Sequence, residues 1–242
     1  MNNITTFHCN VQTHTQTRSV IRVSLYIQLY GFPRTKHLEI FCDSCGGLYK
    51  NVSTFGFFHL LVYYEKRLDY VKKVFPIRGH SYVECDNNVD LIDQGEEAEL
   101  PEDWYQVFQD AQQLSSPFEI INVEEQSEII KGWSAHLDHI YKKKLPFHSR
   151  PGRELEITRE HAALVRFRTS YNGFYEQASL VPPRKKRTTL LTEHDLREGE
   201  ITLPSVHYEG FLKISSEKYK DLQNLKRFFC SETQTYFDHL PQ

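Results

Sequence analysis

Residues 37–77 have the pattern of a strand, a buried helix and a second strand, and this pattern constrains the fold more than any other part of the sequence. β-Rich runs cover 37–42 and 70–77, and the apolar residues between 51 and 68 recur around the whole helix rather than along one face. Two parallel strands need a crossover of about a dozen residues, which this helix supplies. The sequence therefore predicts a βαβ unit and an α/β fold.

Acidic residues follow both strands of the predicted βαβ unit. Asp43 comes after the first strand, and Glu84 and Asp86 come after the second, close to His80. Because the carboxyl ends of parallel strands meet at one edge of a sheet, we expect these side chains to share a crevice. Carboxylate oxygens bind Mg²⁺ or Mn²⁺, so the spacing predicts a divalent-metal site for phosphoryl transfer, with His80 beside the phosphate or a water. The alternative is that Asp43 caps the helix while Glu84 and Asp86 are solvated acids near a helix start.

A zinc site is a competing hypothesis for the same two strand ends. Cys42 and Cys45 have the spacing of a metal knuckle, and His80 and Cys85 would complete a set of three sulfurs and one nitrogen. Strand alternation, however, turns Cys42 away from Asp43. Free buried thiols are the simpler explanation of these cysteines.

Charge is divided between two segments of opposite sign, although the formal net charge is only −3. Between Arg78 and Lys131 there are fourteen acidic residues and no Lys or Arg, whereas 142–187 holds twelve basic residues and four acids. A basic segment attracts phosphate, and aromatic side chains within it stack on bases. Pro182-Pro-Arg-Lys-Lys-Arg187 also has the composition of a nuclear-import signal. The alternative for the whole basic segment is a solvated protein face.

Two sets of side chains in this segment are predicted to contact nucleic acid. The basic set is Lys142, Lys143, Lys144, Arg166, Arg168, Arg184, Lys185, Lys186 and Arg187. The aromatic set is Tyr141, Phe147, Phe167, Tyr171, Phe174 and Tyr175.

The chain is predicted to form three regions. Residues 1–18 are polar without periodicity and are expected to be a disordered lead. An α/β core with a mixed sheet is expected over 19–140, and a basic α+β extension over 141–242. The extension contains a polar loop over 182–200 and a closing helix over 215–239.

Composition favours a globular protein of the nucleus or cytoplasm. Aromatic residues make up 13% of the chain, enough to build a core. No apolar run approaches the roughly 18 residues of a membrane span, and the polar first residues lack the apolar centre of a signal peptide. Five cysteines are an odd number, which is typical of free thiols in a reducing compartment. We therefore expect no membrane partner.

Five motifs occur in order between His37 and the C-terminus. They are Leu38-Glu-Ile-Phe-Cys-Asp-Ser-Cys-Gly-Gly47, Phe75-Pro-Ile-Arg-Gly-His-Ser-Tyr-Val-Glu-Cys-Asp86, Leu100-Pro-Glu-Asp-Trp104, Ser170-Tyr-Asn-Gly173, and Tyr208-Glu-Gly-Phe-Leu-Lys-Ile-Ser215 through Lys218-Tyr-Lys-Asp-Leu222. Together they resemble a large, uncharacterised family of transposon-derived animal proteins with a ribonuclease-H-like domain of the DDE-transposase type.

This resemblance implies a site and an activity. Asp43 would be the second acid of the catalytic set and Asp86 the third, with Glu84 as the alternative third acid and His80 beside them. The implied activity is Mg²⁺-dependent phosphoryl transfer or nuclease action on a polynucleotide, on DNA in preference to RNA. Family members usually have Gln-Asn where this chain has Leu48-Tyr49, which removes two amides near Asp43.

The first acid of such a set is missing, because no Asp or Glu precedes Glu39. We therefore expect an N-terminally truncated or rearranged member with an incomplete ribonuclease-H-like core. Two acids cannot hold two metal ions well, so this member is expected to be inactive and to bind one Mg²⁺ or Mn²⁺ weakly through Asp43 and Asp86. The alternative function is a non-catalytic module that binds nucleic acid or protein through 142–187.

Overall fold

The structure is a computed structural model that describes part of the chain. The described residues are 35–42, 49–77, 98–111, 131–161, 164–182, 204–206 and 213–241. The chain divides into two compact units, one formed by 1–81 with 130–207 and the other by 82–129 with 208–242. The first unit contains the sheet.

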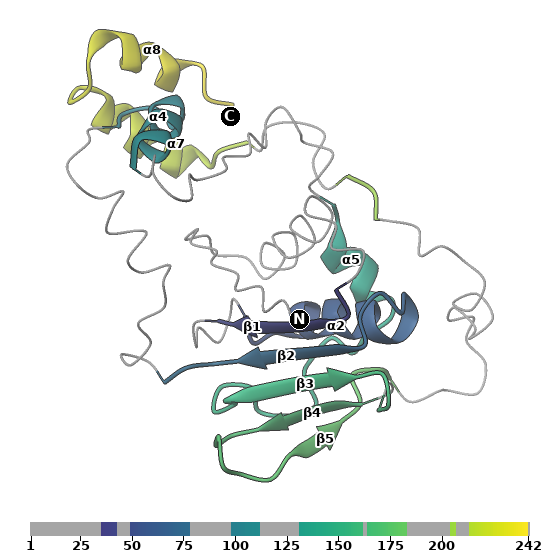
Figure 1. Ribbon diagram of the computed structural model, residues 1–242. Helices are drawn as coiled ribbons and strands as arrows, with labels where there is room; N and C mark the ends of the chain where they lie inside the picture. The colour runs from purple at the N-terminus through teal and green to yellow at the C-terminus, as the bar shows by residue number, and fades with distance from the viewer. Residues whose placement is uncertain are drawn as a thin grey trace. The chain divides into compact units, whose positions relative to one another are not determined.

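The first unit is built on a five-stranded sheet in the order β1-β2-β3-β4-β5 (Figure 1). The strands are β1 (His37–Phe41), β2 (Tyr70–Val74), β3 (Glu154–Thr158), β4 (Val165–Arg168) and β5 (Glu176–Ala178). β1 and β2 are parallel, and every other neighbouring pair is antiparallel. The predicted α/β class with a mixed sheet and a parallel strand pair is confirmed.

The connection between β1 and β2 is the helix α2 (Val52–His59), which continues as a π-helix over Leu60–Tyr64. All eight residues of α2 are buried, as the apolar pattern predicted. Asn51 begins the helix, because its side chain accepts a hydrogen bond from the Thr54 N–H at 2.8 Å. Lys66 follows the π-helix with a φ of 52°, so the chain turns there before β2.

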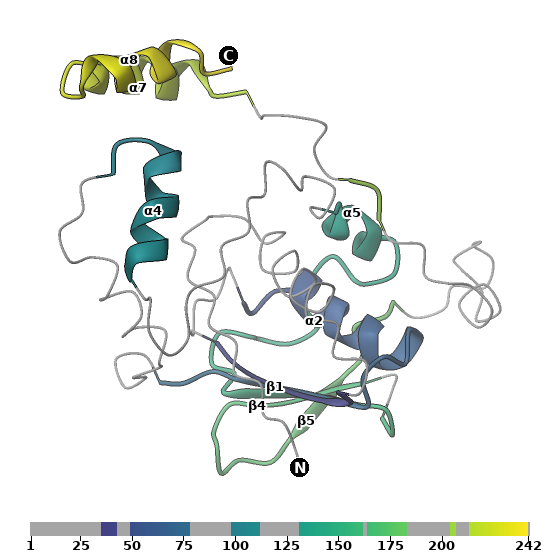
Figure 2. The same ribbon diagram turned by 45° about the horizontal axis from the view of Figure 1, so that its top comes forward.

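Alternation along the strands separates two faces of the sheet. Leu38, Val71 and Ile157 are buried on the face covered by α2 and by α5 (Trp133–Asp138). Figure 2 shows both helices on this side of the sheet. The other face carries charged side chains and is not covered by any described element. The core therefore lies between the sheet and these two helices.

The antiparallel strands β3–β5 lie in the segment that the sequence analysis assigned to the basic extension. β3 pairs with β2 over five residues, from Tyr70 opposite Thr158 to Val74 opposite Glu154. The sheet therefore runs across the predicted boundary between 140 and 141. Partner strands so distant in the sequence leave no local signal of their pairing.

The second unit contains the described helices α4 (Pro101–Ala111), α7 (Ser216–Lys226) and α8 (Ser231–Asp238). A single closing helix was predicted over 215–239, but the structure has two. Cys230 is extended, with φ −64° and ψ 161°, and its N–H donates to the Glu99 carboxylate at 3.4 Å. The chain therefore leaves the helical conformation before α8 and begins a new helix. None of the described helices is both long and apolar enough to span a bilayer.

Replacing Gly56 in α2 with alanine tests the packing under the sheet. A Cβ at this position would lie 2.8 Å from Cδ2 of Tyr141, so the ring must shift. Alanine favours a helix by about 1 kcal/mol over glycine, whereas overpacking a core costs about 1–3 kcal/mol. We expect Gly56→Ala to lower the free energy of unfolding in urea.

The matched control is the same substitution in a Tyr141→Leu background. With the ring removed, Gly56→Ala should be neutral or stabilising. An equal loss of stability in both backgrounds would show that Tyr141 is not the source of the constraint.

Candidate functional site

The candidate site is the end of the sheet at which β1 and β2 finish. The Cys42 N–H donates to the Val74 carbonyl at 3.0 Å, so the two strands end side by side. β3 begins and β4 ends at the same place, because Glu154 pairs with both Val74 and Arg168. We call this region the carboxyl edge and define it by its residues, which are Cys42, Val74–Ile77, Arg150–Glu154 and Arg168–Tyr175.

Phe75 joins three separate segments at the carboxyl edge. Its N–H donates to the Arg153 carbonyl, and its own carbonyl accepts from the Tyr171 hydroxyl, both at 2.8 Å. Lys50 Nζ lies 4.6 Å from the centre of the Phe75 ring and donates to the Gly152 carbonyl at 2.9 Å. The loop before β3 and the loop after β4 are thus both fixed to the end of β2.

Lys73 is a buried lysine that directly precedes this edge in β2, with only 1% of its surface exposed. Its Nζ donates to the Tyr49 carbonyl at 3.1 Å and lies between 5.2 and 5.6 Å from the ring centres of Phe55, Phe58 and Phe75. Burial lowers the pKa of Lys73, and a hydrogen bond with Cys42 partly opposes this shift. The aromatic rings and these polar contacts therefore compensate for the lost hydration of Lys73.

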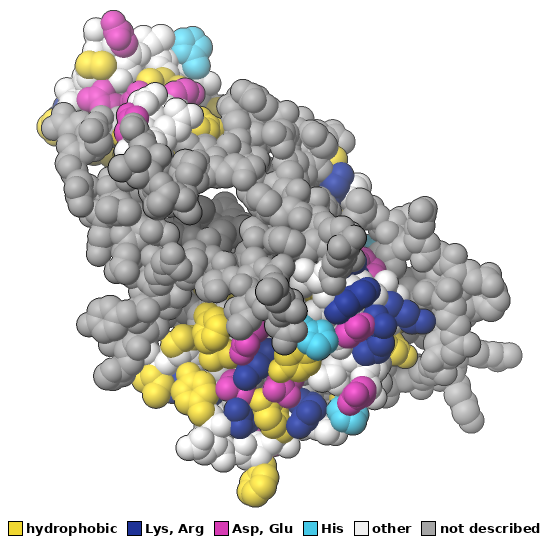
Figure 3. Space-filling model, viewed as in Figure 1, with side chains coloured by type: hydrophobic (Ala, Val, Ile, Leu, Met, Phe, Trp, Pro, Cys, Tyr) yellow, Lys and Arg dark blue, Asp and Glu magenta, His cyan; other side chains and the backbone are white. Residues whose placement is uncertain are grey.

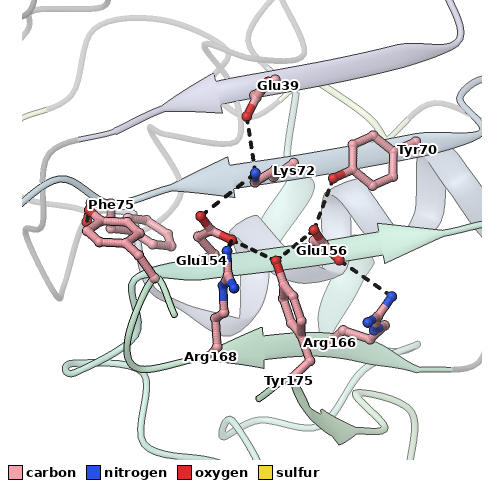
Figure 4. Close-up of polar contacts among 10 residues, drawn as sticks. Glu39, Tyr70, Lys72, Phe75, Glu154, Glu156, Arg166, Arg168 and Tyr175 are labelled. Atoms are coloured by element: carbon pink, nitrogen blue, oxygen red, sulfur yellow. Dashed lines mark hydrogen bonds and ion pairs between the residues drawn. The ribbon is translucent and has the colours of Figure 1, made fainter. Parts of the chain in front are cut away.

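The open face of the sheet carries a cross-strand network of ion pairs (Figure 4). Lys72 lies between Glu39, at 3.5 Å, and Glu154, at 3.7 Å. The Arg168 guanidinium contacts Glu154 at 2.6 Å, and the Arg166 guanidinium contacts Glu156 at 3.6 Å. Figure 3 shows charged side chains of both signs interspersed on this face. Three acids and three bases therefore balance in charge.

Tyr175 connects the two halves of this network. Its hydroxyl lies 2.6 Å from a Glu154 oxygen and 2.7 Å from a Glu156 oxygen, so the two carboxylates share one donor. The guanidinium carbons of Arg166 and Arg168 each lie 4.6 Å from the centre of its ring. Tyr175 is therefore held by hydrogen bonds and by cation–π contacts directly before β5.

The network shifts the ionisation of its own members. Burial raises the pKa of Glu154, but hydrogen bonds from Tyr175 and Arg168 and the charge of Lys72 outweigh it and hold that pKa below its ordinary value. Burial and the two carboxylates raise the pKa of Tyr175. Glu154 is therefore ionised and Tyr175 protonated at neutral pH.

The acids and cysteines predicted to bind metal fall almost entirely outside the described residues. Asp43, His80, Glu84 and Asp86 lie outside them, as do Cys45 and Cys85. Of these two predicted sets, only Cys42 is described. Within the described part of the chain, no group of three or more His, Cys, Asp or Glu side chains is placed to hold a metal ion. The expectation that these side chains share one crevice therefore stays a prediction.

The basic residues predicted to bind nucleic acid differ in their surroundings. Arg166 and Arg168 are engaged by Glu156 and Glu154, and Lys142 Nζ donates to the Ser179 carbonyl at 2.8 Å. Lys143 and Lys144 are exposed, whereas residues 184–187 lie outside the described residues. The alternating charge of β3 and β4 offered a signal for these ion pairs, because Glu154 faces Arg168 and Glu156 faces Arg166 once the register is known.

The structure separates the six predicted aromatic side chains. Tyr141 and Phe167 are buried, and Phe147 stacks on Phe167 at 3.9 Å between ring centres. Tyr171 and Tyr175 are partly buried and hydrogen-bonded. Phe174 is 98% exposed, next to Tyr175. Phe174 is therefore the member of this set whose ring is open to a ligand.

Two arginines that the sequence analysis did not single out lie in the loop before β3. Arg150 is exposed and Arg153 partly exposed. Within the described part of the chain, neither guanidinium takes part in an ion pair or a side-chain hydrogen bond. The available signal was the run 141–153, which has five basic residues and no acid.

Comparisons with known proteins find no protein that is similar to this chain. No family model, no curated protein and no solved structure matches this chain.

Removing the Tyr175 hydroxyl tests the network on the open face. A hydrogen bond to a charged group contributes about 1.5–3 kcal/mol, so Tyr175→Phe should lower the free energy of unfolding by about that amount at neutral pH. Because this bond depresses the pKa of Glu154, its contribution is complete above the ordinary value of 4.5 and declines as the pH falls below it. Urea denaturation at a series of pH values measures both effects.

Tyr171→Phe is the matched control, because Tyr171 donates to the neutral carbonyl of Phe75. Its cost should be smaller and should not change through this pH range. If both variants show the same pH dependence, the Tyr175 hydroxyl does not stabilise the ionised form of Glu154.

Proposed function

We propose that this chain carries a ribonuclease-H-like domain of the DDE-transposase type, which binds polynucleotides without cleaving them. One observation carries the proposal. β1 and β2 are parallel and in register from His37 opposite Tyr70 to Phe41 opposite Val74, with α2 between them. This unit supports the proposal, because the resemblance implies that the second acid, Asp43, follows its first strand directly. Asp43 is the next residue in the chain after Cys42, which hydrogen-bonds to the end of β2.

The proposed lack of cleavage follows from the number of acids. Asp43 and Asp86 would supply two carboxylate ligands to one Mg²⁺ or Mn²⁺, with Glu84 as the alternative to Asp86. A two-metal site needs further acids from other elements of the same crevice. The 242 residues hold no Asp or Glu before Glu39 to act as the first acid. Losing a ligand of this kind weakens transition-state stabilisation by several kcal/mol, or orders of magnitude in rate.

The acids on the open face of the described sheet are poor replacements for the missing ligand. Glu39, Glu154 and Glu156 each contact Lys72, Arg166 or Arg168 on the open face. A metal ion bound there would have to displace these cations and the Tyr175 hydroxyl. This network therefore favours a structural role for the three glutamates.

Binding of nucleic acid is supported by the run 141–153. Five basic residues without an acid give this run a positive field, and Lys143, Lys144 and Arg150 within it are exposed. Residues 184–187 add four basic side chains to the predicted binding set. We propose that DNA is bound in preference to RNA, and that the chain acts in the nucleus or the cytoplasm.

Binding to duplex DNA over a range of salt concentrations tests this function. Each phosphate neutralised contributes a slope of about −0.9 to the plot of log affinity against log salt concentration. Replacing Arg184, Lys185, Lys186 and Arg187 by alanine should flatten the slope without changing the free energy of unfolding. Binding that is absent at low salt, or insensitive to salt, would contradict the proposal.

Cleavage is measured in the same samples on a supercoiled plasmid with Mg²⁺ or Mn²⁺. We expect no nicking above the level of the Asp43→Asn variant. Robust nicking that Asp43→Asn abolishes would show that this chain has a complete catalytic set.

A further inference from the structure

We propose that the carboxyl edge binds single-stranded nucleic acid, with an unpaired base stacked on Phe174 and the backbone phosphates held by Arg150 and Arg153. This inference rests on the proposed function and adds the form of the polynucleotide and the residues that contact it. Its basis is the combination of an exposed ring, a fixed loop and two available cations in one place.

Exposure alone does not distinguish Phe174, since single apolar side chains are common on protein surfaces. Phe174 differs from such residues because hydrogen bonds fix a tyrosine on each side of it in the sequence. Tyr171 is tied to the Phe75 carbonyl at 2.8 Å, and Tyr175 is held by Glu154 and Glu156 at 2.6 and 2.7 Å. Phe174 lies between these two anchors and is 98% exposed. The loop therefore presents the ring already ordered, which reduces the entropy lost when a ligand binds.

Arg153 lies next to this loop through the backbone, and Arg150 is three residues earlier in the loop before β3. The Arg153 N–H donates to the carbonyl of Arg168, the last residue of β4, at 2.8 Å. Extending the β3–β4 register by one pair and the β4–β5 register by two pairs places Arg153, Thr169 and Phe174 in one cross-strand row. Neighbouring strands lie about 4.8 Å apart, so in such a row the Cα atoms of Arg153 and Phe174 would be about 10 Å apart. One short strand of nucleic acid reaches both.

The chemistry of the edge favours a single strand over a duplex. A duplex hides the faces of its bases within the stack, whereas an unpaired base offers its face to an aromatic ring. Arg166 and Arg168 on the open face are neutralised by glutamates, so phosphate is attracted to Arg150 and Arg153 instead. Stacking on a ring with adjacent cations is the pattern of sequence-tolerant single-strand binding.

The test uses fluorescent oligo(dT) of about 16 nucleotides, long enough for one such site, and a blunt duplex of the same length. Phe174→Ala should weaken oligo(dT) binding by about 5- to 150-fold, the range for loss of one stacked base. Phe174→Leu keeps an apolar side chain without a π face and should weaken binding similarly, whereas Phe174→Trp should retain it. Duplex binding should change little in all three variants.

The matched control is Phe228→Ala, which removes an exposed ring (69%) from the other unit and should leave oligo(dT) affinity unchanged. Unchanged urea denaturation of each variant shows that the fold is intact. Replacing Arg150 and Arg153 together by glutamine should reduce the salt slope on oligo(dT) by about 1.4, or 0.7 for each phosphate contact. Arg227→Gln changes an exposed arginine outside the proposed site and should leave this salt slope unchanged.

The outcomes separate this inference from the proposed function. Suppose that the unmodified chain binds oligo(dT) measurably and that Phe174→Ala binds it with the same affinity. This result overturns the stacking site but leaves the proposed polynucleotide binding in place. If Phe174→Leu binds oligo(dT) with full affinity while Phe174→Ala does not, the contact is apolar docking and not base stacking. This result also overturns the stacking site. If the unmodified chain binds neither oligo(dT) nor duplex at low salt, the proposed function itself fails.

Discussion

The pairing of β2 with β3 is the constraint on which the rest of the first unit depends. It joins residues 70–74 to 154–158 and continues beyond the ladder as the hydrogen bond from the Phe75 N–H to the Arg153 carbonyl. Without it, the βαβ unit and the meander of β3, β4 and β5 would not form one sheet. One edge of β2 would then be left without a partner strand. The pairing also brings the loops around Arg153 and Tyr171 to the end at which β1 and β2 finish.

Charged side chains are arranged differently on the open face and at the carboxyl edge. On the open face, glutamates and basic residues neutralise one another across the strands, and a surface ion-pair network of this kind orders side chains more than it attracts a ligand. At the carboxyl edge, Arg150 and Arg153 contact no acid among the described residues. Tyr175 links the two parts, because the network that holds it also fixes the loop carrying Phe174.

Sequence patterns predicted the local elements better than their assembly. The β-rich runs of β1 and β2 and the all-round apolar pattern of α2 are properties of neighbouring residues, and each element formed as a strand or helix where it was expected. The pairing of Glu154 with Arg168, the burial of Lys73 and the exposure of Phe174 depend on contacts between distant segments, which periodicity does not encode. At the break before α8, the Cys230 N–H likewise contacts Glu99, which is far away in the sequence. Asp43 and Asp86 stay predictions.

The most direct test of the central claim, a single-strand site at the carboxyl edge, is ultraviolet cross-linking of oligo(dT) to the chain, followed by tryptic digestion and mass spectrometry. Cleavage after Arg168 and Arg184 releases one peptide that contains Tyr171, Phe174 and Tyr175. The account predicts that the main cross-link lies in this peptide, at Phe174 or a neighbouring residue. Cross-links confined to other peptides, such as those around Lys143 and Lys144, would contradict it.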